Sequence, residues 1–398
     1  GANSLVQRSS LSSSGAWRWT PLSKHSERTD ARRRTSAYGL FPQLSPPLPD
    51  LSSSSAVLHR DLDAIYAALA EDWPRLAGAR IFMTGGTGFI GRWMLEALAE
   101  ADRRLGLGVT VRIVTRNPSS FEAKAPHLSG YRAFEFVTGD VLALEPDGEI
   151  YDYVIHAATD ASADLNENDP RRMFDTIVAG TRAALDFALA AEAKRFFFLS
   201  SGAVYGSQPL GIEKVPENYL GAPDVTAYRN AYAEGKRAAE MLCAIYAKQF
   251  GLDVVNARIF ALLGPLLALD IHFAAGNFIR DAMAGRKVII QSTGTAVRSY
   301  LYAADLTAWL WAILLRAPAN AVYNVGSEEG ISIAQLAERV ATLLGDGGFE
   351  VLGKADAGWN PGIYVPSTAK IRNELGLSPK VGLDEAIRRT AIWNGWNG

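Results

Sequence analysis

A glycine-rich turn between an apolar strand and an amphipathic helix constrains the fold of this chain more than any other feature. The turn reads Gly85-Gly86-Thr87-Gly88-Phe89-Ile90-Gly91, and apolar residues precede it at 81–83 and recur at helical spacing after it. The first, third and fourth glycines lie three residues apart. The first can adopt a positive φ, the next can let the backbone approach a pyrophosphate, and the last can let the helix lie close to the strand.

Such loops also serve as plain turns, but the flanking strand and helix favour a ligand here. The N–H groups of the first helical turn would face the phosphates of a dinucleotide. The segment therefore predicts a dinucleotide-binding turn. Its expected cofactor contacts are Gly85, Thr87, Gly88, Phe89, Ile90 and Gly91.

Predicted strands and helices alternate along the first two-thirds of the chain. Strands are expected at 81–84, 109–115, 134–137, 153–156, 196–200 and 252–260, and long helices at 173–191 and 227–250. This alternation predicts an α/β fold, a parallel, doubly wound sheet of the Rossmann type with right-handed crossovers. After Gly264-Pro265 the alternation stops. Helices near 306–315, 333–344 and 383–393 indicate a smaller mixed α/β lobe over the carboxyl edge of the sheet, where ligands of such folds bind.

The composition divides the chain into three expected parts. Residues 1–55 are rich in serine, arginine and proline, show no sustained apolar period and lack the apolar core of a secretion signal. They could be an organellar transit peptide, a partner-binding tail or sequence upstream of the true start, and an arm without a catalytic role is favoured. Residues 56–262 are expected to form the dinucleotide-binding domain. Residues 263–398 are expected to form mainly the substrate-binding lobe, with the segment at about 296–327 returning to the first domain.

The composition also argues against several classes of function. The 398-residue chain has a net charge of −2, which provides no basic surface for nucleic acid. Its longest apolar runs, 260–269 and 306–315, have ten residues each and are too short to span a bilayer, so no membrane partner is expected. The single cysteine, Cys243, allows no internal disulfide, and the histidines lack metal-ligand spacing, so no metal is expected. The expected compartment is the cytoplasm.

Two further patterns carry groups suited to proton transfer. Tyr232 and Lys236 stand four residues apart in a predicted helix and so share one face, where an ammonium would lower the pKa of the phenol toward the range of a general acid/base. Ser200 and Ser201 end a predicted strand at the ligand-binding edge, where a hydroxyl can hydrogen-bond a substrate oxygen. Each pattern also has a plain structural interpretation. The first could be a solvated helix face, and the second could be a turn in which the serine hydroxyls hydrogen-bond their own backbone.

In combination, these motifs resemble the extended short-chain dehydrogenases/reductases of the NAD-dependent epimerase/dehydratase family, which acts on nucleotide sugars. The resemblance covers about residues 78–398. It rests on the glycine turn, Gly139-Asp140, His156-Ala157-Ala158, Ser200-Ser201, Val204-Tyr205-Gly206, Tyr232 with Lys236, Gly264-Pro265, Arg298 and Asn324-Val325-Gly326.

The resemblance implies a role for each matching position. Tyr232 would be the acid/base that exchanges a proton with a sugar hydroxyl, Ser201 would bond the reacting oxygen, and Lys236 would hold the nicotinamide ribose and lower the pKa of Tyr232. Besides these and the glycine turn, cofactor contacts are expected from Arg116, Asp140, Val141, Ala157, Ala158, Thr159, Ile259 and Phe260. Substrate contacts are expected from Ser201, Asn277 and Arg298, whose guanidinium suits a diphosphate because it offers a planar fork of donors.

Arg116 departs from the pattern of many relatives, which carry an acidic residue at the end of the second strand. An aspartate there bonds the ribose 2′-hydroxyl of NAD, whereas an arginine accommodates the 2′-phosphate of NADP. NADP is therefore favoured over NAD, the alternative being an arginine that points to solvent.

Gly202 and Ala203 are a second departure. The 4,6-dehydratases of the family carry Asp-Glu at these positions as the acid and base of water elimination, and sugar-acid decarboxylases keep the glutamate. Glycine and alanine exchange no proton, so both reactions are disfavoured. Ile177 and Ala261 replace asparagines that are usual in the family, which leaves the details of the substrate pocket open.

The sequence therefore favours an NAD(P)-dependent enzyme that moves a hydride to or from C4 of a nucleotide-linked sugar. A 4-ketoreductase is slightly favoured over a 4-epimerase because Arg116 indicates NADP, and a 4,6-dehydratase or decarboxylase is the disfavoured alternative. A non-catalytic NADP-binding sensor or scaffold is an alternative of another class, against which the presence of Ser201, Tyr232 and Lys236 argues. The helices at 173–191 and 227–250 resemble the pair through which family members dimerise, so a homodimer is expected.

Overall fold

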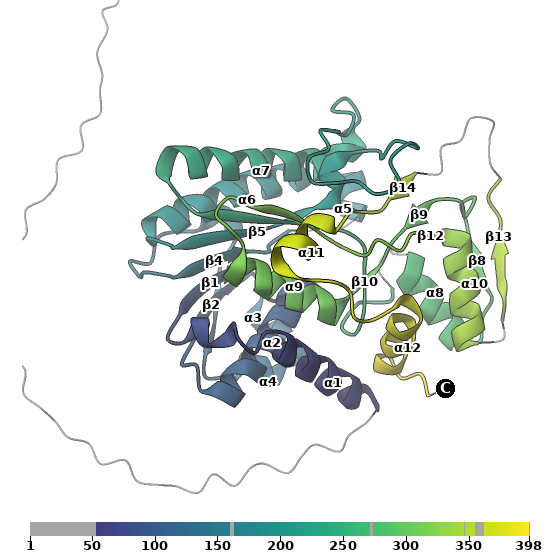
Figure 1. Ribbon diagram of the computed structural model, residues 1–398, viewed down its shortest axis with the longest axis horizontal. Coiled ribbons are helices and arrows are strands. Elements are labelled where there is room, and N and C mark those ends of the chain that lie inside the picture. The colour runs from purple at the N-terminus through teal and green to yellow at the C-terminus, as the bar shows by residue number, and fades with distance from the viewer. Residues whose placement is uncertain (1–52, 160–162, 271–273, 346, 355–361, 398) are drawn as a thin grey trace, which may run out of the picture. The chain divides into compact units, whose positions relative to one another are not determined.

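Seven parallel strands form the main sheet (Figure 1). The computed structural model describes residues 53–397 except for 160–162, 271–273, 346 and 355–361. The strands are β1 Arg80–Thr84, β2 Thr110–Thr115, β3 Phe134–Thr138, β4 Tyr153–His156, β5 Arg195–Ser201, β6 Val254–Ile259 and β11 Val322–Val325. Their order in the sheet is β11-β6-β5-β4-β1-β2-β3, which confirms the predicted doubly wound α/β fold.

The order of the strands reverses its direction between β1 and β4. The chain runs from β1 outward to β3, then returns to β4 on the other side of β1 and continues outward in the opposite direction. In open parallel sheets, ligands bind beside the carboxyl ends of the strands at this reversal point. Of the seven strands in the main sheet, the prediction missed only β11, an edge strand of four residues that pairs with β6.

Helices cover both faces of the sheet. Alternate residues of β1 divide between two core clusters: Ile81 and Met83 lie in the cluster with α2 (Phe89–Leu105) and α9 (Ala303–Arg316), and Phe82 lies in the cluster with α6 (Pro170–Ala190) and α7 (Ala231–Phe250). Figure 1 shows α6 and α7 on one side of the sheet and α2 on the other. Because the central strands are buried on both faces, their sequences are continuous apolar runs instead of alternating patterns.

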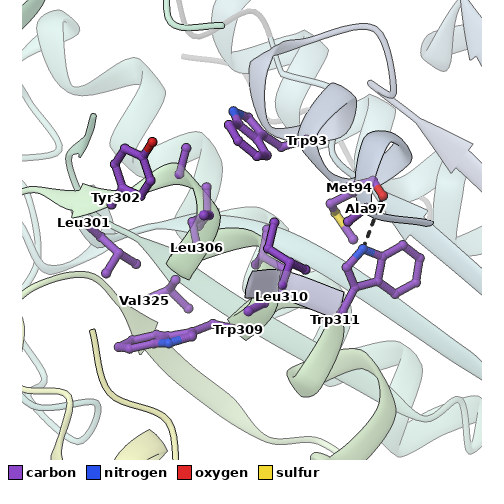
Figure 2. Packing of buried hydrophobic residues seen from close by; sticks show 14 of the residues in the cluster. Trp93, Met94, Ala97, Leu301, Tyr302, Leu306, Trp309, Leu310, Trp311 and Val325 are labelled. Carbon is purple, nitrogen blue, oxygen red and sulfur yellow. Dashed lines mark hydrogen bonds between the residues drawn. The ribbon is translucent and has the colours of Figure 1, made fainter. Parts of the chain in front are cut away.

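The core around α9 contains buried tryptophans, among them Trp93, Trp309 and Trp311 (Figure 2). Trp309 and Trp311 are buried, and the indole of Trp311 donates a hydrogen bond of 3.3 Å to the carbonyl of Met94 on α2. Trp93, also on α2, donates to the carbonyl of Pro265 at 2.9 Å. The indole N–H groups of Trp93 and Trp311 thus have acceptors, as the interior of a protein requires. The hydrogen bond from Trp311 joins α9 to α2 in addition to their apolar contact.

The remaining elements of the described chain are mostly short. Its other helices are α1 Ser53–Ala68, α3 Pro118–Lys124, α4 Pro126–Ser129, α5 Ala163–Asn168, α8 Ala274–Met283, α10 Ile333–Leu344, α11 Ala369–Leu375 and α12 Leu383–Trp393. Single 3-10 turns are η1 Trp73–Leu76, η2 Val141–Ala143, η3 Gly202–Tyr205 and η4 Tyr228–Asn230. Short strands are β7 Leu262–Leu263, β8 Val288–Ile290, β9 Val297–Arg298, β10 Leu301–Tyr302, β12 Ile331–Ser332, β13 Phe349–Val351 and β14 Ile363–Tyr364.

The chain beyond residue 263 takes part in several layers. Helix α9 covers the main sheet and β11 is its edge strand, whereas β12, β9 and β14 form a separate three-stranded sheet in that order. The expected N-terminal arm, 1–55, lies outside the described residues except for its last three positions, which are in the first turn of α1. The division at residue 262 stays a prediction. Among the described helices, none combines the length and apolar character needed to cross a bilayer.

Candidate active site

The glycine turn lies at the carboxyl end of β1, beside the end of β4. Gly85 has a φ of +74°, and a Cβ atom there would lie 2.4 Å from the carbonyl carbon of Ala157. A Cβ atom at Gly91 would lie 2.3 Å from the carbonyl oxygen of Gly85. A Cβ atom at Gly88, in contrast, would have no atom nearer than 3.4 Å. The fold itself therefore requires the first and last of these glycines, and the open space at Gly88 is available to a ligand.

His156 joins the strands beneath this turn. It is buried, its Nδ1 lies 2.7 Å from the Thr84 hydroxyl, and its Nε2 lies 3.1 Å from the Thr181 hydroxyl. Burial and the nearby charge of Lys236 lower the pKa of the imidazole to about 3, so it is neutral at physiological pH. His156 is thus a structural link between β1, β4 and α6.

Lys236 lies at the centre of the site and is only 2% exposed. Its ammonium donates to the Thr159 hydroxyl at 2.7 Å and to the carbonyl of Leu199 at 2.8 Å. Burial lowers the pKa of Lys236 to about 7, and the carboxylate of Glu240 opposes that change. Lys236 therefore connects α7 with β5, through Leu199, and with Thr159, which follows β4.

Tyr232 lies one turn before Lys236 on α7 and is half-buried. Its backbone N–H donates to Asn166 at 3.0 Å. Burial raises the pKa of the phenol, and a hydrogen bond with the Ser201 hydroxyl lowers it in part. The pKa of Tyr232 is therefore raised, not lowered as the Tyr-x-x-x-Lys spacing predicted, because burial outweighs the neighbouring groups and Lys236 directs its hydrogen bonds elsewhere.

Ser201 completes this group at the carboxyl end of β5. Its hydroxyl accepts a hydrogen bond of 3.2 Å from the N–H of Ala203, which caps the 3-10 turn η3. In the sheet, Ser201 is the register partner of Ile259 on β6. The structure thus brings Ser201, Tyr232, Lys236 and Thr159 to one place, on the edge of the sheet that the glycine turn also occupies.

Phe260 follows β6 and closes one wall of the site. Its ring occupies the space in front of Gly202, where a Cβ atom would lie 2.5 Å from the Phe260 Cζ atom. The ring also packs against Tyr364, with 4.5 Å between the centroids, and against Tyr205, at 6.4 Å. Phe260 is 4% exposed. A side chain longer than hydrogen at position 202 would have to displace this ring.

The residues expected near the adenosine lie around the ends of β2 and β3. Arg116 and Lys124 line a cavity of about 210 Å³ together with Thr87, Thr115, Asn117, Ser120 and Phe121, and no carboxylate is among these residues. Asp140 accepts a hydrogen bond of 2.9 Å from the N–H of Leu142 and so caps η2. Val141 contacts α6 at Gly180, where a Cβ atom would lie 3.0 Å from the valine. The cavity is cationic and rich in hydroxyl and amide groups, as an anionic ligand requires.

The two expected substrate residues are placed differently. Arg298 lies on β9 beside Tyr364, its register partner on β14, and donates to the carbonyls of Val297 and Gly362. Tyr364 in turn lies near Ser201, so Arg298 borders the catalytic group. Asn277 lies partly buried on α8, and none of its described contacts connects it with Ser201, Tyr232 or Lys236.

Sequence reasoning missed several residues that shape the site. Glu240 on α7 accepts from Ser200 at 2.6 Å and forms a partly buried ion pair of 2.6 Å with Arg258 on β6. The spacing 232, 236, 240 would have placed Glu240 on the catalytic face of α7. No local pattern identifies Tyr364 or Asn166, because each reaches the site through contacts between distant segments. Among the described residues, no cluster of histidine, cysteine, aspartate and glutamate could hold a metal ion.

The fold and the site together define a class, the Rossmann-type dinucleotide-binding proteins with a serine, tyrosine and lysine at the carboxyl edge of the sheet. The sequence profile of the NAD dependent epimerase/dehydratase family matches residues 81–326. UDP-glucuronic acid decarboxylase 1 of Xenopus tropicalis is 30% identical over 311 residues, which are 78% of this chain and 71% of that protein. The chain belongs to the NAD-dependent epimerase/dehydratase family.

Solved structures show the same fold. UDP-glucose 4-epimerase of Thermotoga maritima matches with a TM-score of 0.66 at 24% identity, over 79% of this chain and 98% of the other. The dTDP-glucose 4,6-dehydratase DesIV of Streptomyces venezuelae, solved with NAD and TYD bound, matches with a TM-score of 0.67 at 22% identity, over 79% and 96% of the two chains.

Substitution of Gly91 by alanine should lower stability, whereas substitution of Gly88 by alanine should weaken cofactor binding. Gly91→Ala forces a Cβ atom against the Gly85 carbonyl and should lower the free energy of unfolding by about 1–3 kcal/mol or more. Gly88→Ala should leave stability within about 0.5 kcal/mol of the parent and weaken NAD(P) binding, because its Cβ faces open space. Denaturant unfolding and calorimetric titration with NAD(P)H measure the two effects. Unchanged affinity in Gly88→Ala would mean that the ligand does not approach this backbone.

Proposed function

We propose that the protein is an NAD(P)-dependent enzyme that transfers a hydride to or from C4 of a nucleotide-linked sugar, with a 4-ketoreductase slightly favoured over a 4-epimerase. The observation that carries the proposal is the juxtaposition of Ser201, Tyr232 and buried Lys236 at the edge where the glycine turn lies. Membership of the family supports the nucleotide sugar as substrate, since the similar proteins act on UDP- and dTDP-sugars by their names.

The glycine turn and the reversal point of the sheet fit a dinucleotide, which would supply or accept the hydride. Gly88 leaves space for the pyrophosphate, and Lys236 has a third N–H beyond those given to Thr159 and Leu199, which suits a ribose hydroxyl. Tyr232 would donate its proton to the oxygen at C4 as the ketone is reduced, and Ser201 would hydrogen-bond the same oxygen. In an epimerase, Tyr232 would remove and then return that proton, while the keto sugar rotates between the two steps.

The reductase is favoured by Arg116, and the protonation state of Tyr232 is compatible with it. Burial raises the pKa of the phenol, so Tyr232 carries its proton at neutral pH, which a proton donor to a forming alkoxide needs. An epimerase begins with a proton removed from the sugar, for which a lowered pKa would be suitable. A bound dinucleotide would add its own charges beside Tyr232 and so change the pKa of the phenol. Both the reductase and the epimerase reactions therefore stay within the proposal.

A decarboxylase is the second candidate, because the curated relatives include UDP-glucuronic acid decarboxylases. Oxidation at C4 of a sugar acid produces a β-keto acid, which can lose CO₂ without a dedicated acid or base. Ala203 therefore disfavours decarboxylation less than it disfavours 4,6-dehydration, in which a base must remove a proton and an acid must protonate the leaving hydroxyl. A non-catalytic sensor or scaffold would have no use for a buried lysine in contact with Thr159 and Leu199.

Product analysis decides between these reactions. UDP-, dTDP-, CDP- and GDP-sugars, their 4-keto-6-deoxy forms and UDP-glucuronic acid are incubated with NADH or NADPH. A reductase consumes NADPH stoichiometrically, an epimerase returns its cofactor, and a decarboxylase releases CO₂. Tyr232→Phe should lower kcat by a factor of roughly 10² to 10⁴, whereas Tyr228→Phe, an exposed control near the start of the same helix, should not. Full activity of Tyr232→Phe would contradict the mechanism.

We propose NADP as the preferred cofactor. Arg116 and Lys124 border a cavity at the end of β2, where the adenosine ribose of such folds lies, and its described lining residues include no carboxylate. Two cations with Ser120 and Asn117 suit a 2′-phosphate, which NAD lacks. The similar dehydratase DesIV was solved with NAD, whereas the proposed preference for NADP rests on Arg116 and Lys124 of this chain.

Removal of these cations should change the choice of cofactor. Arg116→Ala and Lys124→Ala should each raise the Kd for NADPH roughly tenfold to hundredfold, since hydrogen bonds to charged groups contribute about 1.5–3 kcal/mol, and leave the Kd for NADH within about twofold. Fluorescence titration with both cofactors measures this. An equal loss of affinity for NADH would contradict a 2′-phosphate site.

We also propose a cytoplasmic homodimer. Helix α7 carries two exposed apolar side chains four residues apart, Met241 at 62% and Ile245 at 37% exposure, which lie on one face. Burial of such side chains against a second copy would stabilise the pair by about 1.5–3 kcal/mol each. The single, buried Cys243 fits a reducing compartment.

The double substitution Met241→Glu/Ile245→Glu should produce a monomer at micromolar concentration by light scattering, because it would bury four carboxylates at the interface. Leu210→Glu is the matched control, since Leu210 is 65% exposed in the loop that follows η3. A wild-type monomer, or an unchanged dimer in the double variant, would refute this interface.

A further inference from the structure

Thr159 follows β4 at the carboxyl edge of the sheet, beside the glycine turn. The segment that carries it lies against that turn, because a Cβ atom at Gly85 would be 2.4 Å from the backbone nitrogen of Ala158. The N–H of Ala158 also donates to the Thr84 hydroxyl, at the end of β1, over 3.4 Å. The position of Thr159 is therefore tied to the backbone of the glycine turn.

The Thr159 hydroxyl has a defined polarity. It donates its single hydrogen to the carbonyl oxygen of Ala158, 2.7 Å away, so only its lone pairs are available to other groups. One lone pair receives an N–H of Lys236, whose Nζ atom lies 2.7 Å from the Thr159 oxygen. Thr159 is therefore an acceptor toward Lys236, and such an acceptor favours the ammonium over the neutral amine.

The Lys236 ammonium has three N–H groups and no lone pair. Thr159 receives one of them, and the carbonyl of Leu199 on β5 receives another at 2.8 Å. Because the two acceptors lie on different elements, they hold the ammonium from two sides and fix the direction of its third N–H. The ring of Phe198, whose centroid lies 4.7 Å from Nζ, adds a cation–π contact. Lys236 is 2% exposed, so bulk water has little access to replace a lost acceptor.

The charge of Lys236 is balanced close to neutral pH. Burial lowers the pKa of Lys236 to about 7, and Glu240 and Cys243 on the same helix oppose this change. His156 on β4 is neutral because burial lowers its pKa to about 3, and Tyr232, whose pKa is raised, keeps its proton. The loss of one acceptor therefore changes the charged fraction of Lys236 most strongly near pH 7.

We propose that Thr159 is a positioning residue, whose hydroxyl oxygen holds the Lys236 ammonium in its charged form and leaves the third N–H for the dinucleotide. The proposal rests on the proposed function, in which Lys236 donates to a ribose hydroxyl. Because Thr159 is tied to the glycine turn, the oxygen that orients Lys236 has a fixed place relative to the backbone that would hold the pyrophosphate.

Thr159→Val tests this role, because it removes the hydroxyl and keeps the branched shape of the side chain. The pKa of Lys236 should fall, since the ammonium loses an acceptor. Carbon-13 NMR of Cε-labelled lysine in the cofactor-free protein measures this pKa, with the resonance assigned by Lys236→Met. The Kd for NADPH, measured by fluorescence titration, should rise roughly twofold to tenfold, the effect of one hydrogen bond.

Two controls separate the hydroxyl from the rest of the side chain. Thr159→Ser keeps the hydroxyl and should keep the pKa of Lys236, with the Kd for NADPH within about twofold of the parent value. Thr342→Val makes the same chemical change at an exposed hydroxyl on α10, which donates to the Glu338 carbonyl of its own helix, and should change neither quantity. Equal changes in Thr159→Ser and Thr159→Val would assign the effect to packing and overturn the positioning role.

The outcomes separate this role from the proposed function. An unchanged pKa of Lys236 in Thr159→Val overturns the positioning role, whatever the activity of the variant. A lower pKa with an unchanged Kd for NADPH overturns the assignment of the third N–H to the dinucleotide. If the wild-type protein turns over no nucleotide sugar, the proposed function fails, and the two titrations still decide whether Thr159 holds Lys236.

Discussion

The partly buried ion pair between Glu240 and Arg258 fixes helix α7 against the sheet, and the geometry of the site depends on it. Arg258 lies on β6, and its guanidinium bonds both carboxylate oxygens of Glu240 on α7. Glu240 follows Lys236 by one turn and Tyr232 by two, so the pair sets the register of both against β5 and β6. Removing one partner would leave the other charge partly buried and without its ion-pair partner. The carboxylate also opposes the effect of burial on Lys236, whose pKa of about 7 leaves it partly charged at neutral pH.

The same pair connects the site to the late chain. Arg258 donates to the Tyr205 hydroxyl at 2.8 Å, which donates to Asn324 on β11, also at 2.8 Å. The amide of Asn324 then donates to the carbonyls of Val215 and Ser367. A continuous series of hydrogen bonds thus runs from α7 to the segment just after β14. Cooperative burial of these polar groups explains why residues beyond 320 belong to the catalytic site and not only to a substrate-binding lobe.

The sequence correctly predicted those elements of the fold that local residue patterns determine. Apolar runs located six of the seven strands, and the three-residue spacing of Gly85, Gly88 and Gly91 located the turn. It also placed Tyr232 and Lys236 together, since four residues make one helical turn. It did not predict the pKa of Tyr232, because burial arises from tertiary contacts and outweighs the neighbouring charge. Nor did it predict Tyr364, which enters the site through pairing of β14 with β9 across more than 60 residues.

The steric contacts around Gly202 provide a second argument about which reaction the protein catalyses. From the sequence, glycine at this position means only that an acid is missing. In the structure, the Phe260 ring fills the space that an acidic side chain would need, and Tyr364 packs against that ring. An aspartate at 202 would therefore have to displace the Phe260 ring. This steric obstacle adds to the missing carboxylates in disfavouring water elimination.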